Sequence, residues 1–270
     1  MDFSRYNILA NDIRKMIIEA AFTAGKNNAH VGGSLSMVEI LIALYFFFVK
    51  RDENNLNERD RIILSKAHAS LALYCILIKK GLLPENALES FEQNGSKYTV
   101  HARREIEKGL EFSGGSLGLG CSYGIGVALA LKERKSSSHV YIILGDGECN
   151  EGIVWESLMF AKHHNLDNLT IIVDRNHLQA DGDTEKIIDT SSLEDKFKAF
   201  GFYSRKVNGH SIEDLVEALS SRKAGMPNAI IAETIKGKGV SFIENKSQWH
   251  FSYLSENRYK KALSELNNKS

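Results

Sequence analysis

The chain has 270 residues, with 34 basic and 34 acidic side chains and 43% hydrophobic residues, the composition of an ordinary soluble globular protein. This balance of charge gives no indication of binding to nucleic acid or to an anionic membrane, and we expect neither partner. The three cysteines, Cys75, Cys121 and Cys149, are well separated and form neither a metal-binding pattern nor a disulfide framework. That usage favours a cytoplasmic location. Residues 1–12 lack the apolar core of a secretory signal, and the apolar run 40–49 is too short to span a bilayer.

The first part of the chain is predicted to be mainly helical. Apolar residues recur at helical spacing over residues 4–26, and a second helix is expected over residues 36–49. Ser36, with Glu39 three residues later, has the pattern of a capping box at the start of that second helix. A short strand over residues 61–65 and helices over residues 70–80 and 86–93 follow.

The second part alternates strands with helices. A glycine-rich stretch, residues 113–120, opens a helix that runs to about Lys132. Strands are expected over residues 139–144, 169–173, 203–207 and 229–235, with helices over residues 151–164, 193–200, 212–221 and 253–266. This alternation predicts an α/β fold, a mainly parallel sheet with helices on both faces. We expect residues 1–270 to form a single domain.

Polar residues follow two of these strands directly. The strand at residues 139–144 ends in Gly145-Asp146-Gly147, and the strand at residues 169–173 is followed by Asn176. Ligands of open α/β sheets bind at the carboxyl ends of the strands, so Asp146 and Asn176 are expected to converge there. Two hard oxygen ligands beside glycine amides and a helix N-terminus suit Mg²⁺ and a diphosphate. An ordinary strand–helix turn with a capping Asp is the alternative for this stretch by itself.

Four of the nine histidines lie beside small residues after a strand or between helices: His30, His68, His101 and His250. A single such histidine is more often structural than functional. Four of them around a phosphate site favour function, because imidazole hydrogen-bonds phosphate oxygens and exchanges protons near neutral pH.

The order of these motifs resembles the amino-terminal, diphosphate-binding half of transketolase. In particular it is similar to the short chain of split transketolases, whose other half is a separate polypeptide. The matching segments are residues 30–36 (HVGGSLS), 64–69 (LSKAHA), His101, 114–120 (GGSLGLG), 144–152 (LGDGECNEG), 174–176 (DRN) with 181–182 (DG), and 236–242 (KGKGVSF) with 249–250 (WH). The resemblance covers nearly the whole chain and implies the thiamine-diphosphate-binding fold.

The resemblance also implies how thiamine diphosphate and Mg²⁺ would be held, with Ca²⁺ or Mn²⁺ able to substitute for the metal. Asp146, Asn176 and the main-chain carbonyl of Leu178 would be the metal ligands. The other expected cofactor contacts are the amide of Gly147 and the imidazoles of His68 and His250 at the diphosphate, with Gly115 and Leu117 at the aminopyrimidine.

The resemblance assigns catalysis to His30, His101 and His250. His30 and His101 would face the substrate, move protons and hold the hydroxyls of the donor. Glu151 matches a position at the family's subunit contact, and it could equally be a carboxylate favoured by the start of its own helix. The implied reaction moves a two-carbon ketol unit from a ketose or ketose phosphate to an aldose-type acceptor.

In this family the carboxylate that activates the aminopyrimidine belongs to the other half, for which this chain has no room. We therefore expect a separate C-terminal-type, pyrimidine-binding subunit, assembly into a heterotetramer and a sugar or sugar-phosphate substrate. Several positions depart from the family pattern, which leaves the substrate open: Val31, Ala67, Ala102, Leu119 and Phe251. The alternatives are the corresponding subunit of a 2-oxo-acid decarboxylase or dehydrogenase, and a non-catalytic cofactor-binding homologue.

Overall fold

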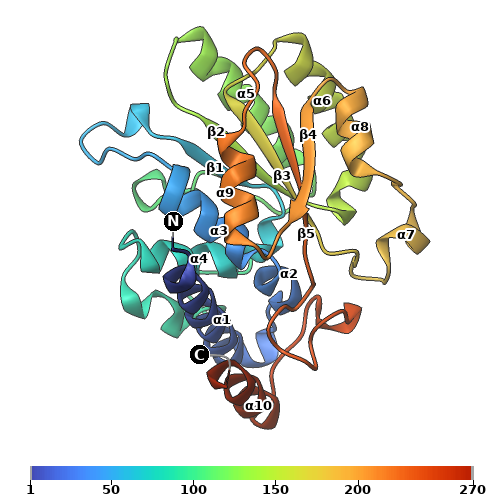
Figure 1. The fold of residues 1–270 in the computed structure, drawn as a ribbon. Helices are drawn as coiled ribbons and strands as arrows, with labels where there is room; N and C mark the ends of the chain where they lie inside the picture. Colours follow the sequence, from blue (N-terminus) through green and yellow to red (C-terminus); the bar gives the residue numbers. More distant parts are fainter. Residues whose placement is uncertain (1, 269–270) are drawn as a thin grey trace.

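The computed structural model describes residues 2–268. Its centre is a five-stranded parallel sheet in the order β1-β2-β3-β5-β4 (Figure 1). The strands are β1 (Arg61–Leu64), β2 (Val140–Gly145), β3 (Leu169–Arg175), β4 (Tyr203–Asn208) and β5 (Asn228–Glu233). The α/β prediction, a mainly parallel sheet, is confirmed.

Ten α-helices accompany the sheet in the described part of the chain. They are α1 (Ser4–Ala24), α2 (Val31–Leu35), α3 (Val38–Ala43), α4 (Ser70–Lys79), α5 (Leu119–Glu133), α6 (Gly152–His163), α7 (Thr184–Ile187), α8 (Leu193–Ala199), α9 (Ile212–Ser220) and α10 (Glu256–Asn267). Shorter helical turns include the π-turn η2 (Leu44–Phe48) and the 3₁₀ turns η4 (Ala67–Ala69), η5 (Glu85–Ser90), η7 (Gly147–Asn150) and η8 (Ser247–Trp249). No helix among residues 2–268 is long and apolar enough to cross a membrane.

The two faces of the sheet bury separate apolar clusters because side chains alternate along each strand. In β2, Ile142 and Leu144 pack with α5, α6 and α8 on one face. Tyr141 and Ile143 pack on the other face with the cluster that contains α3, α4 and α9. Helices α1 and α10 pack against each other and extend this second layer away from the sheet (Figure 1). Every residue of β2 is buried, which explains its continuous apolar sequence.

The expected helix over residues 36–49 is wrong as a single element. Helix α2 ends before Ser36, α3 begins at Val38, and the π-turn η2 continues from it. Ser36 is not an N-cap, because its hydroxyl donates to the buried carboxylate of Asp174 at 2.6 Å. Glu39 does not close a capping box, because Arg14 holds its carboxylate at 2.7 and 2.9 Å.

The helix expected over residues 86–93 is also wrong, since this stretch forms the 3₁₀ turn η5. The remaining predicted strands and longer helices are confirmed with ends that differ by a few residues. The glycine-rich stretch opens α5 as predicted, and Gly118 precedes the helix with φ of 79°. A left-handed conformation of this kind suits glycine.

Candidate functional site

The carboxyl ends of β2 and β3 bring the two predicted oxygen ligands together. Gly145 pairs with Asp174 in the register of the two strands, so Asp146 and Asn176 follow at the same edge of the sheet. The carboxylate of Asp146 accepts hydrogen bonds from the amides of Gly147, at 2.8 Å, and of His177. The side-chain oxygen of Asn176 accepts from the amide of Leu178 at 3.2 Å. The predicted convergence of these residues is confirmed.

Asp146 is a buried carboxylate in the neighbourhood of a second one. Only 4% of its surface is exposed. Burial and the Asp174 carboxylate together raise the pKa of Asp146 to about 6. A bound cation at this position would favour the ionised form and offset the cost of burying the charge.

The donor set fits a hard divalent cation. Among residues 2–268, no three side chains of the His, Cys, Asp and Glu types gather to hold a metal ion. The set would instead combine one carboxylate from Asp146, the amide oxygen of Asn176 and the carbonyl oxygen of Leu178. This carbonyl already accepts a hydrogen bond from the ammonium of Lys236 at 2.8 Å, so it faces a cationic group. Carboxylate, amide and carbonyl oxygens suit Mg²⁺ or Ca²⁺.

Behind these oxygens lies a fully buried ion pair between Lys66 and Asp174. Burial favours the neutral acid, but Lys66 and three further hydrogen bonds hold the pKa of Asp174 below its usual value. The ammonium of Lys66 also donates to the carbonyl of Gly33 at 3.1 Å. The pair therefore connects the segment after β1, the end of β3 and helix α2.

A second buried lysine, Lys236, lies after β5. Its ammonium donates to the carbonyl oxygens of Leu178 and Gln179 and to Nδ1 of His250, the last at 3.0 Å. Burial and the nearby charge of Lys66 lower the pKa of Lys236 to about 8. Lys236 thus joins the loop that carries the predicted metal ligand to the loop that carries a predicted catalytic histidine.

The four histidines singled out from the sequence form one cluster. The ring centroid of His30 lies 5.3 Å from that of His68, 6.0 Å from that of His101 and 5.1 Å from that of His250. The rings of His68 and His250 are 5.2 Å apart. Phe251 covers one side, with its ring centroid 4.5 Å from that of His30.

Three of these imidazoles, those of His30, His68 and His250, are kept in the neutral form. Burial lowers the pKa of His30 to about 3 and that of His250 to about 4. Burial, together with Lys66, holds the pKa of His68 well below its usual value. A neutral imidazole offers one donor and one acceptor. The buried Nδ1 of His30 has no hydrogen-bond partner within the described chain.

The glycine-rich loop lies beside this cluster. A Cβ on Gly114 would lie 2.4 Å from the Cβ of Ala67, the residue before His68, so the two backbones approach closely. The buried carboxylate of Glu148 accepts hydrogen bonds from the amides of Gly118 and Gly145 at 2.8 and 3.1 Å. The end of the loop is thereby fastened to the end of β2.

The remaining predicted site residues lie at the surface. Gly115 and Leu117 are exposed on the glycine-rich loop, and Leu117 has 36% of its surface accessible. Glu151 is also exposed, at the residue before α6, and its side chain makes no capping hydrogen bond. These positions are open to a molecule outside the chain.

Sequence reasoning missed Lys66, Glu148, Asp174 and Lys236 as individual site residues. All four are charged side chains that lie at the ends of strands or just beyond, and all are at most 2% exposed. Lysines and carboxylates are almost never fully buried unless they are paired. Their position next to continuous apolar runs is the signal that could have identified them.

Comparison with known proteins defines the class. Residues 6–268 match the family described as transketolase, thiamine diphosphate binding domain. The chain therefore belongs to this family. Solved transketolases share the fold: the structure of the Leishmania mexicana enzyme superposes with a TM-score of 0.86 over 96% of this chain, at 26% sequence identity. The chain spans 40% of the length of that enzyme.

Two relatives of similar length are named as transketolase subunits. The chain is 41% identical over 261 residues to the 6-deoxy-6-sulfo-D-fructose transketolase subunit of a Clostridium species, covering 95% of this chain and 94% of the relative. It is 36% identical to an apulose-4-phosphate transketolase subunit of Actinobacillus succinogenes, covering 97% of this chain and 98% of the relative. Human transketolase is 34% identical over 95% of this chain and 41% of its own length.

These comparisons confirm the resemblance inferred from the motifs. They support a thiamine-diphosphate-dependent, transketolase-type transferase subunit, and they do not favour the 2-oxo-acid decarboxylase or the non-catalytic alternative.

Proposed function

We propose that this chain holds Mg²⁺ and thiamine diphosphate at the carboxyl edge of its sheet and carries out ketol transfer together with a separate, pyrimidine-binding subunit. The observation that carries the proposal is the meeting of two groups at that edge. The oxygens of Asp146, Asn176 and Leu178 lie on one side, and the four clustered imidazoles of His30, His68, His101 and His250 lie on the other. Lys236 joins the two groups by hydrogen bonds to Leu178 and His250.

In this proposal Asp146, Asn176 and the Leu178 carbonyl bind the metal, and the amide of Gly147 contacts the diphosphate with His68 and His250. Lys236 fixes the tautomer of His250. Because the ammonium donates to Nδ1, the proton of the neutral ring must be on Nε2. His250 can therefore donate that proton in a hydrogen bond to an anionic oxygen.

Thiamine diphosphate supplies an electron sink for breaking the bond next to a ketose carbonyl. The residues of this chain supply positioning and proton transfer. His30 has an unpaired buried nitrogen, and we assign to it, with His101, the holding of substrate hydroxyls and the movement of protons. Gly115 and Leu117 on the exposed loop are proposed to contact the aminopyrimidine.

Several observations support a partner subunit. Two relatives that match over more than nine-tenths of their own length are named subunits, whereas human transketolase, of which the chain covers 41%, is more than twice as long. Glu151, Gly115 and Leu117 are exposed next to the proposed cofactor site and are available to such a partner. We propose a heterotetramer in the cytoplasm, with residues 1–270 as one domain and a sugar or sugar phosphate as substrate.

The test is two-carbon transfer between a panel of ketose phosphates and glyceraldehyde 3-phosphate, measured with the purified chain alone and with a candidate partner subunit. We expect turnover only when both chains are present. Robust turnover by the chain alone would contradict the need for a partner. Absence of turnover by both chains, when thiamine diphosphate is bound, would contradict ketol transfer. His101→Ala should lower turnover strongly, and the exposed His163→Ala serves as the matched control.

A further inference from the structure

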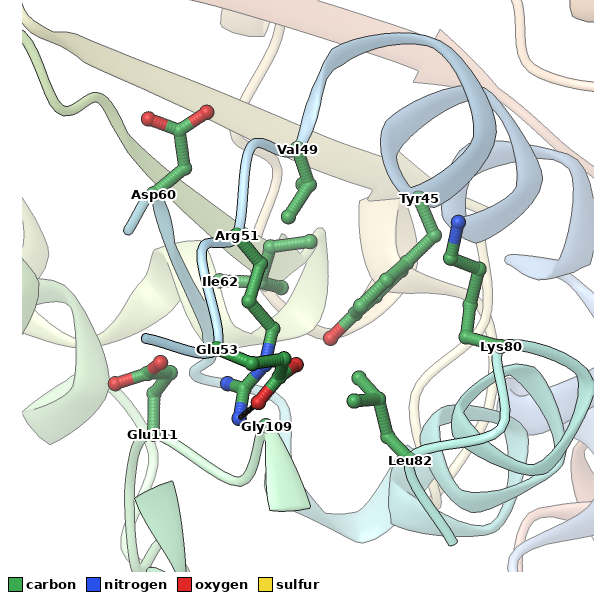
Figure 2. Close-up of a pocket in the computed structure, with 10 residues that line it drawn as sticks. All are labelled: Tyr45, Val49, Arg51, Glu53, Asp60, Ile62, Lys80, Leu82, Gly109 and Glu111. Carbon is green, nitrogen blue, oxygen red and sulfur yellow. Dashed lines mark hydrogen bonds and ion pairs between the residues drawn. The ribbon is translucent and has the colours of Figure 1, made fainter. Parts of the chain in front are cut away.

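A cavity of about 200 Å³ lies at the amino end of β1, and the histidine cluster lies beyond the carboxyl end of this strand. Figure 2 shows its lining. Asp60 and Ile62 line it at the amino end of β1, whereas Lys66 and His68 follow the carboxyl end of the same strand. The proposed cofactor site therefore does not include this cavity.

The walls of the cavity are mostly apolar. They include the ring of Tyr45 and the side chains of Val49, Ile62 and Leu82. Tyr45 lies in the π-turn η2, Ile62 in β1, and the other two follow η2 and α4. In Figure 2 the four side chains surround a common space. Burial of an apolar ligand body against them would be favourable.

The acidic groups that reach the cavity already have partners. Arg59 holds the carboxylate of Glu111 through two bonds of 2.6 Å each. The carboxylate of Asp60 accepts hydrogen bonds from the amides of Lys50 and His139 at 2.9 and 2.7 Å. Each carboxylate is thus already stabilised by two N–H donors, which reduces its attraction for a cationic ligand.

Of the basic groups, Arg51 is engaged by an ion pair and hydrogen bonds, and the exposed Lys80 contacts an aromatic ring. The guanidinium of Arg51 binds the carboxylate of Glu53 and donates to two main-chain carbonyls. The ammonium of Lys80 lies 4.8 Å from the centroid of the Phe46 ring, a cation–π contact. An anionic ligand would have to displace one of these contacts and lose its own hydration.

One polar group in the lining has no partner. The hydroxyl of Tyr45 points into the cavity in Figure 2, and no hydrogen bond joins it to any described residue. Tyr45 is only 6% exposed, so a water molecule can reach its hydroxyl only through the cavity. Burial raises the pKa of Tyr45, which keeps the hydroxyl protonated as a donor and acceptor.

Tyr45 owes this position to the π-turn η2, in which the amide of Val49 donates to the carbonyl of Leu44 at 2.9 Å. A π-turn widens the helix by one residue and occurs frequently at functional sites.

We propose that this cavity binds a small neutral molecule with an apolar body and one hydrogen-bonding oxygen, which the Tyr45 hydroxyl holds. The apolar walls bind the body. The paired charges disfavour acids and amines of the same shape.

The probes for the test share a cyclohexane ring: cyclohexanol, cyclohexanecarboxylate and cyclohexylamine. Each is titrated into the full chain at millimolar concentration while methyl NMR shifts are followed. We expect cyclohexanol to give saturable shifts at the methyl groups of Val49, Ile62 and Leu82, and the two charged probes to bind at least tenfold more weakly. Equal or tighter binding of a charged probe would overturn the proposal, as would the absence of saturable shifts.

Tyr45→Phe keeps the ring and removes only the hydroxyl, so the fold should be retained. Loss of one hydrogen bond should weaken cyclohexanol binding about threefold to tenfold. Tyr253→Phe is the matched control, because that side chain is 49% exposed and outside the cavity. Unchanged binding by Tyr45→Phe would overturn the role of the hydroxyl. A second variant, Leu82→Trp, should fill the cavity and abolish the shifts.

Discussion

The two ends of the parallel sheet both bury charged groups, and they arrange them differently. At the amino end, the buried carboxylates have separate partners: Arg59 binds Glu111 through two hydrogen bonds, and Asp60 accepts from two backbone amides. At the carboxyl end, charges share partners. Asp174 accepts from the side chains of Lys66, Ser36, Thr234 and Asn176, which come from four segments.

This difference distinguishes buried charges that stabilise the fold from buried charges that form a binding site. At the amino end, separate partners satisfy the carboxylates of Glu111 and Asp60, which line the cavity at Tyr45. At the carboxyl end two lysines, two aspartates and a group of imidazoles converge, and Lys236 is hydrogen-bonded to both His250 and the carbonyl of Leu178. Convergence of several charges, rather than burial of one, marks the site.

The largest expected effect is loss of the central ion pair of the carboxyl end. Lys66→Met leaves the carboxylate of Asp174 buried without its counter-ion, and we expect a loss of about 3–5 kcal/mol in the free energy of unfolding. Urea denaturation measures it. Lys132→Met is the control, because the Lys132–Asp167 pair is partly exposed and should contribute less than about 1 kcal/mol. Similar losses in the two variants would contradict a larger role for the buried Lys66–Asp174 pair than for the partly exposed Lys132–Asp167 pair.

The second prediction concerns acid sensitivity at the amino end. Burial and Arg222 lower the pKa of His139 to about 3. The folded chain therefore keeps this ring neutral while the unfolded chain takes up a proton below about pH 6.5, so stability is lost as the pH falls toward 3.

His139→Gln should remove about 1.4 kcal/mol per pH unit from the slope of unfolding free energy between pH 6 and 4. Urea denaturation at several pH values measures the slope. The exposed His163→Gln should leave it unchanged. A slope in His139→Gln equal to that of the parent chain would show that His139 is not buried in the neutral form.

The third prediction tests the tight approach of the glycine-rich loop. A Cβ on Gly118 would lie 2.4 Å from Cγ2 of Ile153 at a φ of 79°. Gly118→Ala should cost about 1–3 kcal/mol in unfolding free energy. Gly126→Ala, within α5 and facing open space, should instead stabilise the chain by about 0.5–1 kcal/mol. Thermal unfolding separates the two, and a shift of the same sign in both would reject the proposed packing.

The smallest effect is expected at the rim of the amino-end cavity. The side chain of Glu53 is 62% exposed in its pair with Arg51. Glu53→Gln should change the unfolding free energy by less than about 0.5 kcal/mol, because solvent screens such pairs. A loss above about 1 kcal/mol in urea denaturation would mean that the rim pair is as important as the buried ones.

Much of the carboxyl end could be predicted from the sequence because its signals are local. Apolar runs gave the positions of β2 and β3, and Asp146 and Asn176 directly follow those runs. His30, His68, His101 and His250 were singled out by their position beside small residues after a strand or between helices, and the family resemblance assigned their roles. The roles of these residues remain predictions.

What could not be predicted depends on contacts between distant positions. Lys66 and Asp174 are 108 residues apart, and neither neighbourhood indicates the other. The same reason explains the error at Ser36, since a Ser-x-x-Glu pattern looks identical whether its hydroxyl caps a helix or binds a carboxylate from another strand. The cavity at Tyr45 likewise depends on a π-turn that helical periodicity does not predict.

The central claim is that Asp146 anchors a metal and thiamine diphosphate. Isothermal titration measures the affinity of the chain for thiamine diphosphate in Mg²⁺ and in EDTA. The partner subunit is added if binding to the chain alone is too weak. We predict Mg²⁺-dependent binding by the parent chain and a loss of at least about 100-fold in Asp146→Ala, equivalent to about 2.7 kcal/mol, with an unchanged circular dichroism spectrum. Equal affinity in Asp146→Ala, or equal affinity without Mg²⁺, would contradict the proposed site.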